Sequence, residues 1–593
     1  MNMLAVILPL LCFMVLLKKD DLRESFIISA VACGFFITIS TEVLSLFNLL
    51  AFTPLVLCWL LYLLSLVAWN YYHKSNSPKI ACTDIALSQK ILLVLVFSVV
   101  GITGVAAVIA APNNFDSLTY HLPRVMHWIQ NRSVEHYPTH IDRQLLMAPF
   151  SEYAIMHLQI LSGSDRFANC VQWFSMVGSA VGVSLIARVL QGSLNSQIVS
   201  AALSVSIPMG LLQATSTQTD YVVSFWLVCL TYFIIKARES ADSRNALYVG
   251  GCLALAIFTK GTTYLAAVPF MMIYLWSAIT KGMKAATANM LIISVAILLI
   301  NGGHYARNFK VYGTPISPGS GNSVLSGRVD ATSVLSGVTK NIATQLTTGI
   351  QPANSALFAL VNGVHNAIGV DVNDTDLTAD RGFLILPEQV LNSEDYAPNP
   401  LHMVLMLLSA LTLVLWRRKY SRETIMFATA TILSFVALSF GIKWTPFISR
   451  YFLSAFIIFS PFIALLYDGE KLRPIVNSFA AALLFLSFTL LANNPMRPLI
   501  GPKSVFVTER IDQYFMVNPQ AKPYFTATAN MIKGQPITNI GILDRDGNMW
   551  EYILWVLLKN DGVNYRIEHV EGIKNRSGEI KLENFTTYFP VRI

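Results

Sequence analysis

The chain has 593 residues, of which 54% are hydrophobic and 13% are charged, and its mean hydropathy is +0.54. Soluble globular proteins carry about twice that share of charged residues, so the composition excludes a large soluble enzyme, a disordered scaffold and a disulfide-built secreted module. The net charge is +8, but the basic residues are dispersed between apolar blocks, which argues against a nucleic-acid partner.

About fourteen apolar blocks of roughly membrane-spanning length follow one another along the chain. They are 2–17, 25–47, 50–72, 91–111, 168–188, 197–213, 220–236, 245–259, 261–279, 289–303, 400–416, 424–441, 451–467 and 475–492. Short basic segments such as 417–419 recur between the blocks, and the intervening short loops are almost free of lysine and arginine. Since basic residues stay on the cytoplasmic side, this pattern predicts a multi-pass protein of the cell inner membrane with both termini extracytoplasmic.

This arrangement divides the chain into three parts. Residues 1–90 hold additional N-terminal spans, 91–492 form the core, and 493–593 form an extracytoplasmic domain. Two long polar segments, 112–167 and 304–399, interrupt the core on the outer side. We therefore expect a mainly α, polytopic membrane helical bundle whose working face is extracytoplasmic. No phosphate-binding glycine loop precedes a helix, which argues against an ATP-driven pump.

The first outer segment, 112–167, is apolar and aromatic. Helical spacing over 122–130 and 151–162 predicts amphipathic helices that lie along the membrane surface. Pro123 suits the first turn of such a helix, where its missing N–H is not needed. The second segment, 304–399, is rich in Gly, Ser, Asn and Thr, which favours an irregular loop with short helices.

The C-terminal part, 493–593, alternates short β-like runs with one helical stretch. The runs are 539–543, 565–570 and 588–593, and the helical stretch is 549–560. This alternation predicts a small α/β domain after the last span.

Two acidic residues lie at the outer ends of apolar blocks. Asp116 follows the fourth block and Asp220 opens the seventh. A carboxylate between apolar walls is desolvated, which raises its pKa toward the range of a general base. The alternative is that each acid caps the helix it precedes. The sequence leaves both interpretations open, although two acids at one membrane depth favour a shared cavity.

Three cations are expected at the same face. Lys260 lies in an outer turn that the positive-inside rule would leave uncharged, Arg307 follows the tenth block, and Arg450 precedes the thirteenth. Snorkelling of the lysine to the interface is the alternative to a functional role. Arginine suits bidentate recognition of phosphate, so the three together indicate a contact with an anion at the membrane surface.

The order of these motifs is more specific than any one of them. They are the acid and following helix Asp116 to Trp128, Asp220 in a Thr/Ser-rich turn, Thr259-Lys260-Gly261, the stretch Arg307 to Pro315, and Arg450-Tyr451. Together, along 91–492, they resemble the GT-C superfamily of integral-membrane glycosyltransferases, and within it the bacterial transferases similar to protein O-mannosyltransferases and lipid A aminoarabinose transferase.

The resemblance implies transfer of a sugar from a polyprenyl-phosphate carrier to an acceptor at the outer face, with inversion. The acceptor would be a glycan, a lipid or a protein of the cell envelope. Asp116 would deprotonate the acceptor nucleophile, and Asp220 would be a second acid near it. The donor phosphate would be bound by Lys260, Arg307 and Arg450. Residues expected to contact donor or acceptor are Tyr120, His121, Arg124 and Tyr451.

Two features depart from the family pattern. The family usually carries its catalytic acid after the first span, whereas about ninety residues with three spans come first here. Ser117 follows Asp116, where several relatives carry a second acid. Because some members of the superfamily need a divalent ion, this difference favours catalysis without Mg²⁺ or Mn²⁺, and the sequence assigns no metal ligand.

Two other functions remain as alternatives. An O-antigen ligase or polymerase would depend on Arg307 or Arg450 and not on Asp116. A lipid-sugar flippase or solute transporter would carry charged residues deep within its spans and inverted repeats. Here the spans are nearly free of charge and the ionisable residues gather at one face, which favours chemistry at the surface over transport.

Overall fold

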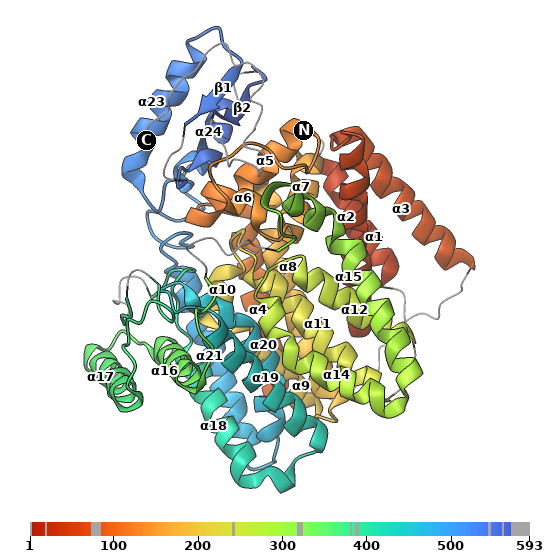
Figure 1. Ribbon diagram of the computed structural model, residues 1–593, viewed down its shortest axis with the longest axis vertical. Helices are drawn as coiled ribbons and strands as arrows, with labels where there is room; N and C mark the ends of the chain where they lie inside the picture. The colour runs from red at the N-terminus through yellow and green to blue at the C-terminus, as the bar shows by residue number, and fades with distance from the viewer. Residues whose placement is uncertain are drawn as a thin grey trace.

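The computed structural model describes residues 3–17, 21–72, 85–239, 243–316, 324–379, 382–385, 391–543, 547–559 and 562–570. Within these ranges the chain is mainly helical, as the sequence predicted. Figure 1 shows a bundle of long helices with a small α/β unit at one end, beside helices of the first outer segment.

The apolar blocks of the sequence coincide with the helices of the bundle. These are α1 (Ile7–Leu16), α2 (Leu22–Leu46), α3 (Phe52–Tyr72), α4 (Leu87–Ile109), α8 (Cys170–Val189), α9 (Leu194–Val205), α10 (Pro208–Gln213), α11 (Asp220–Glu239), α12 (Ser243–Ile257), α13 (Thr263–Ala266), α14 (Val268–Lys281), α15 (Met283–Tyr312), α18 (Pro400–Trp416), α19 (Arg422–Gly441), α20 (Leu453–Leu466) and α21 (Arg473–Ala492). Two blocks are each divided between a pair of helices, α9 with α10 and α13 with α14.

The span count of about fourteen is not confirmed. Ten helices among the described residues are long and apolar enough to cross a membrane by length and composition. Others are too short, since α9 and α12 have 12 and 15 residues and a crossing needs about 20. The ten helices nevertheless make this a multi-pass membrane protein.

Helix α11 lies at the centre of the bundle. It packs against α8, α12 and α20, and 94% of its most apolar window is buried. A helix enclosed on all sides is apolar all round, which explains why its sequence shows no polar face. Its first residue, Asp220, is therefore carried at the end of the best-packed element of the fold.

The first outer segment contains the two predicted helices and three shorter elements. They are η2 (Ser117–His121), α5 (Leu122–Asn131), α6 (Arg143–Leu146), α7 (Phe150–Ser162) and η3 (Asp165–Phe167). Helices α5 and α7 match the predicted stretches 122–130 and 151–162, and Pro123 lies in the first turn of α5. The element η2 is a π-helical turn immediately after Asp116, a type of irregularity that is frequent at functional sites.

The second outer segment is more regular than predicted. Helix α15 continues to Tyr312, nine residues beyond its apolar block, and ends where Gly313 adopts a left-handed conformation with φ 73°. The polar residues 304–312 extend the helix, so the loop does not begin at 304. The short helices expected further on are α16 (Ala331–Leu346) and α17 (Gln351–Ile368), with 16 and 18 residues.

The C-terminal domain has the predicted α/β character. It contains α22 (Arg510–Gln513), η7 (Pro519–Ala521), α23 (Lys522–Lys533), β1 (Asn539–Ile542), α24 (Glu551–Leu558) and β2 (Arg566–His569). The two strands pair in parallel, with Asn539 opposite Arg566 and Ile542 opposite His569. A parallel pair needs a crossover, which α24 supplies. The predicted run 588–593 lies outside the described residues.

Candidate active site

Five charged residues meet at one end of the bundle, each near the end of a different helix. Asp116 follows α4, Asp220 opens α11, and Lys260 lies in the turn after α12. Asp395 precedes α18, and Arg450 lies in η6 (Ile448–Phe452), directly before α20. We call these five residues the acid–base cluster. The rigid helices of the bundle thus hold its side chains in place.

Arg450 joins two carboxylates of the cluster. Its Nη1 donates to Asp116 Oδ2 at 2.7 Å and to Asp395 Oδ1 at 3.4 Å. The Nε2 of Gln218 also donates to Asp395 Oδ1, at 3.2 Å. On the other side of Asp116, Arg143 Nη1 lies 4.0 Å from Oδ1. Asp116 therefore lies between two guanidinium groups, and one of them is shared with a second acid.

Lys260 and Asp220 form the second ion pair of the cluster. The Lys260 ammonium donates to Asp220 Oδ1, and it lies 4.6 Å from the ring centroid of Tyr451. The Arg450 guanidinium lies 5.6 Å from the same ring. Tyr451 thus contacts both cations and connects the two ion pairs, an arrangement in which the ring face attracts positive charge.

The helix-capping alternative does not account for either acid. Asp116 has helical backbone angles and its side chain accepts no capping hydrogen bond. The amide of Ser117 is instead satisfied by the Oδ1 of Asn114, at 2.7 Å. At the start of α11, Gln172 Oε1 accepts from the amides of residues 221 and 222, at 2.7 and 3.1 Å. Both carboxylates are therefore available for the ion pairs of the cluster.

The two acids that share Arg450 have opposite pKa shifts. Burial raises the pKa of Asp116, but Arg450, His121 and Arg143 outweigh burial and bring it to about 2. Burial raises the pKa of Asp395 as well, and there the nearby Asp116 carboxylate adds to burial, so that the pKa reaches about 6 despite Arg450. Two acids whose environments push their pKa values apart are typical of acid–base sites.

Two polar atoms of the cluster are buried without a hydrogen-bond partner among the described residues. They are Arg450 Nε and Asp220 Oδ2. A buried donor or acceptor that is left unpaired costs free energy. The unpaired N–H of Arg450 provides a donor for an anionic group, and the unpaired oxygen of Asp220 provides an acceptor for a hydroxyl.

A second buried ion pair, between Arg497 and Glu394, lies next to the cluster. Arg497 donates to Glu394 Oε2, and its Nη1 donates to Asn113 Oδ1 at 2.6 Å. The other carboxylate oxygen of Glu394 accepts from Asn114 Nδ2 at 2.5 Å. Since Glu394 directly precedes Asp395, this network fixes the segment of Asp395 against the segment of Asp116.

Arg307 is not brought to the cluster in the same way. Its guanidinium is bidentate to Glu42, with distances of 2.8 and 2.7 Å, and also donates to Tyr153 Oη at 2.9 Å. Arg307 lies on the polar extension of α15, and Glu42 lies near the C-terminal end of α2. The carboxylate of Glu42 is thus the negative partner of Arg307 in this structure, whereas the sequence predicts a donor phosphate as that partner.

The residues expected to contact substrate divide into two groups. Tyr451 belongs to the cluster, and Tyr120 lies beside it with its ring centroid 5.3 Å from the guanidinium of Arg143. His121 Nδ1 and Arg124 Nη1 instead lie 2.8 and 3.1 Å from Glu152 Oε1. Burial raises the pKa of Glu152, but Arg124 and the hydrogen bond from His121 outweigh burial and lower it. His121 and Arg124 therefore hold the π-helical turn against α7, which carries Glu152.

Sequence reasoning missed Asp395 and Arg143. Asp395 lies in Asn392-Ser393-Glu394-Asp395-Tyr396, five residues before the start of α18. The rule that selected Asp116 and Asp220, an acid at the outer end of an apolar block, would have found it. Arg143 carries no such signal, because it lies in the middle of the first outer segment.

Comparisons with known proteins give structural likenesses and nothing at the level of sequence. No family model matches the chain, and no curated protein matches it. ArnT from Cupriavidus metallidurans bound to undecaprenyl phosphate is 13% identical with a TM-score of 0.46, over 81% of this chain and 86% of that chain. The same protein in the apo state is 12% identical with a TM-score of 0.44, over 82% and 87%.

An archaeal structure is similar at the same level. The oligosaccharyltransferase of Archaeoglobus fulgidus, in complex with Zn and sulfate, is 14% identical with a TM-score of 0.42, over 82% of this chain and 64% of that chain. Identities this low concern the fold alone and assign no activity to this chain.

Proposed function

We propose that this chain is an integral-membrane glycosyltransferase that moves a sugar from a polyprenyl-phosphate carrier to an acceptor at the extracytoplasmic face. The observation that carries the proposal is the acid–base cluster itself. A carboxylate, Asp116, lies against a guanidinium, Arg450, at the ends of apolar helices. A base for an acceptor hydroxyl and a cation for a leaving phosphate are the two groups that such a transfer needs.

In the proposed reaction the acceptor hydroxyl oxygen attacks the anomeric carbon and forms the new glycosidic bond. The bond between that carbon and the phosphate oxygen breaks, and its electron pair leaves on the phosphate. The acceptor proton passes to the carboxylate of Asp116. Attack from the face opposite the phosphate inverts the anomeric centre. Lys260 and Arg450 stabilise the negative charge that develops on the phosphate oxygen.

Donor binding has a direct effect on the base. Arg450 is one of the cations that hold the pKa of Asp116 at about 2, and a carboxyl group with so low a pKa is a weak base. When Arg450 turns to the donor phosphate, the pKa of Asp116 rises toward the range of an effective base. The donor therefore activates the base, and Asp395 keeps a carboxylate beside Arg450 during the exchange.

The remaining cluster residues receive roles in the same proposal. Asp220 holds the Lys260 ammonium and offers its unpaired oxygen to a sugar hydroxyl. Tyr451 and Tyr120 supply ring faces for the sugar or the acceptor. The acceptor is a glycan, lipid or protein of the cell envelope, and the site faces outward from the inner membrane.

The variant Asp116→Asn tests the base. Polyprenyl-phosphate-linked sugars are supplied in liposomes with envelope acceptors, and release of polyprenyl phosphate is measured. A positioned general base contributes about 10²–10⁴-fold, so we expect transfer to fall at least about 100-fold while binding of the carrier persists. Asp376→Asn, at an exposed position, is the matched control and should keep full activity. Near-normal turnover of Asp116→Asn would contradict the proposal.

The variant Lys260→Ala tests the phosphate contact. A hydrogen bond to a charged group contributes about 1.5–3 kcal/mol, so carrier affinity should fall on the order of 10–100-fold, seen as a raised KM for donor. Lys310→Ala is the control, because the side chain of Lys310 is 71% exposed. Unchanged donor affinity in Lys260→Ala would remove this residue from the phosphate site.

The same variants separate the alternatives. An O-antigen ligase would lose activity when Arg450 is replaced and keep it in Asp116→Asn. A flippase or transporter would move the carrier between leaflets without releasing free polyprenyl phosphate. Release that depends on Asp116 is expected only of the proposed transferase.

A further inference from the structure

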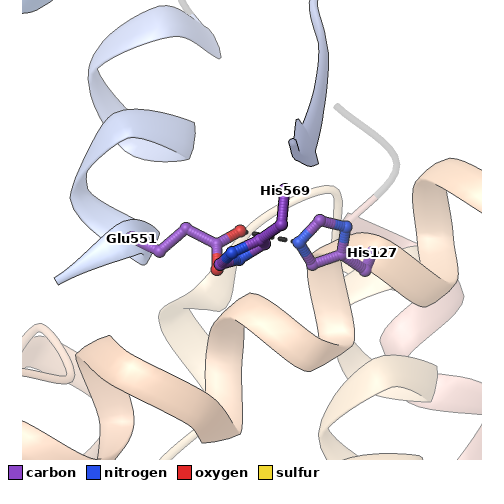
Figure 2. Close-up of side chains that lie close together, drawn as sticks. All are labelled: His127, Glu551 and His569. Atoms are coloured by element: carbon purple, nitrogen blue, oxygen red, sulfur yellow. Dashed lines mark hydrogen bonds and ion pairs between the residues drawn. The ribbon is translucent and has the colours of Figure 1, made fainter. Parts of the chain in front are cut away.

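Three side chains of types that can ligate a metal, from distant parts of the chain, meet outside the acid–base cluster. Figure 2 shows His127, Glu551 and His569 turned toward one another. The Nε2 of His127 lies 2.7 Å from Glu551 Oε1, and the Nε2 of His569 lies 3.1 Å from Glu551 Oε2. One ligand atom from each residue lies within 4.8 Å of the others. We call these three residues the His–Glu–His cluster.

The cluster is enclosed by protein. Glu551 and His569 are fully buried, and His127 is 1% exposed. Glu551 also accepts from Gln144 Nε2 at 3.0 Å and from Trp555 Nε1 at 3.1 Å. Gln144 and Trp555 are neutral donors, so a buried carboxylate faces two amide or indole groups and two imidazoles. A buried carboxylate costs free energy unless hydrogen bonds and an opposite charge compensate it.

The chemistry of the donor set indicates which charge fits. Two imidazole nitrogens and one carboxylate form a set that binds Zn²⁺ in proteins, with bonds of about 2.0–2.2 Å. Tetrahedral ligands at that bond length lie roughly 3.3 Å apart, and the two nitrogen–oxygen distances here are 2.7 and 3.1 Å. These two distances involve different oxygens of Glu551, and one ligand atom from each residue lies within 4.8 Å of the others. An ion would therefore enter after side-chain shifts on the order of an ångström.

We propose that His127, Glu551 and His569 bind a zinc ion, or another divalent transition metal with the same ligand preference, as a structural link. His127 lies on α5, Glu551 opens α24, and His569 ends β2. The ion would thus fasten the C-terminal domain to the first outer segment. Its expected fourth ligand is a water molecule, which completes a tetrahedral set.

One residue, Gln144, connects the proposed metal site with the turn that follows Asp116. Gln144 Nε2 donates to Glu551 Oε2 and also to the carbonyl oxygen of Thr119, both at 3.0 Å. Thr119 lies in the π-helical turn that follows Asp116. Gln144 is therefore a positioning residue between the proposed metal and that turn. The proposal does not depend on the glycosyltransferase assignment, since the metal is detected without any assay of transfer.

Metal content of the purified full-length protein tests the proposal. The protein is purified without chelator and its zinc is measured by mass spectrometry, with the expectation of about one ion per chain. His127→Gln and His569→Gln should each lower bound zinc at least about tenfold, and Gln144→Ala should weaken it about 10–100-fold, as for residues that orient ligands. His365→Gln, a buried histidine on α17, is the matched control and should keep its zinc.

Cobalt provides a second measurement on the unaltered protein. After chelation, titration with Co²⁺ alone should produce the visible absorption of a tetrahedral site with nitrogen and oxygen ligands, and chelation should lower the Tm. The cobalt titration tests the proposed metal site even if a histidine variant does not fold. Wild-type protein that carries no stoichiometric transition metal and shows no cobalt spectrum would overturn the proposal, as would zinc that survives in both histidine variants.

Discussion

At the scale of single residues, Asp395 has the most informative environment. It is an aspartate with a pKa of about 6, raised first by burial and then by the neighbouring carboxylate of Asp116. In the unfolded chain its pKa is about 3.9. Between these values the folded protein binds a proton that the unfolded chain does not bind. Stability therefore falls as the pH rises from about 4 to about 6.

The variant Asp395→Asn should remove this pH dependence. Asn is neutral and can still accept the hydrogen bond from Gln218. We expect the Tm of the variant, relative to that of the wild type, to increase as the pH rises from 4 to 6. Above that range the difference should stay constant. Each pKa unit corresponds to about 1.4 kcal/mol. The measurement is the apparent Tm in detergent across this range.

Asp376→Asn serves as the control for that experiment, because Asp376 is exposed. Its Tm should follow the wild type at every pH. If the Tm difference between Asp395→Asn and the wild type were the same at pH 4.5 and pH 7, the raised pKa would be wrong.

The sequence identified four of the five cluster residues by a rule about position, and it could not rank them. Acids and bases at outer helix ends included Asp116, Asp220, Lys260 and Arg450, which meet, and Arg307, which pairs with Glu42. The sequence around Arg307 gives no indication of its partner, because ion pairing between distant segments depends on the packing of the helices that carry them.

At the scale of elements, α16 controls the position of Arg450 without belonging to the cluster. Gln345 Nε2 donates to Ser449 Oγ at 3.1 Å, and Gln345 Oε1 accepts from Asn399 Nδ2 at 2.8 Å. Ser449 precedes Arg450, and Asn399 lies four residues after Asp395. One glutamine of an outer helix thus fixes the two segments that carry the guanidinium and its second carboxylate.

The variant Gly337→Ala should disturb that helix. A Cβ at Gly337 would lie 2.8 Å from the backbone carbonyl carbon of Ser439 on α19, and closer still to its oxygen. Backbone atoms cannot yield as a flexible side chain does, so α16 must move. Overpacking of this kind costs about 1–3 kcal/mol. We expect a lower Tm and, because Gln345 moves with the helix, reduced transfer activity.

A glycine on the next helix gives the matched control. A Cβ at Gly363 on α17 would meet no other atom within 4 Å. Alanine is favoured over glycine within a helix by about 1 kcal/mol, so Gly363→Ala should leave the Tm unchanged or raise it. Equal effects of the two substitutions would show that the close approach of α16 and α19 is not as described.

At the scale of the whole molecule, the helix ends that carry the cluster all lie on one face. The positive-inside pattern predicts that this face is extracytoplasmic. Lys310 lies on the polar extension of α15, 3.9 Å from Glu135 of the first outer segment. Arg418 follows the C-terminal end of α18, whereas Asp395 of the cluster precedes its N-terminal end. The two residues therefore report the orientation of the bundle.

Cysteine labelling checks this orientation. In a background with the seven native cysteines replaced, Lys310→Cys in spheroplasts should react with a membrane-impermeant maleimide, and Arg418→Cys should react only after lysis. Both positions are exposed to solvent, so detergent-solubilised protein should label at each. The reverse pattern would place the acid–base cluster in the cytoplasm.

The sequence predicted the helices well because long apolar blocks have few other folded forms in a membrane. It predicted β1, α24 and β2 because their short alternating runs are local features. It did not reveal that α15 continues to Tyr312, since a polar helix held by tertiary contacts lacks an apolar signature. It also could not join His127 to Glu551, because their contact spans 424 residues.

The pairing of Asp116 with Arg450 also determines how late in synthesis the acid–base cluster can form. The two residues are 334 positions apart in the chain. At a synthesis rate of about 5–20 residues per second, roughly 15–70 seconds separate their emergence from the ribosome. During that interval the nascent protein has inserted the helix before Asp116 and has no guanidinium to place beside it. A chain that stops short of Arg450 is therefore a membrane protein without a complete acid–base cluster, and the proposed transfer needs a chain that extends at least to Arg450.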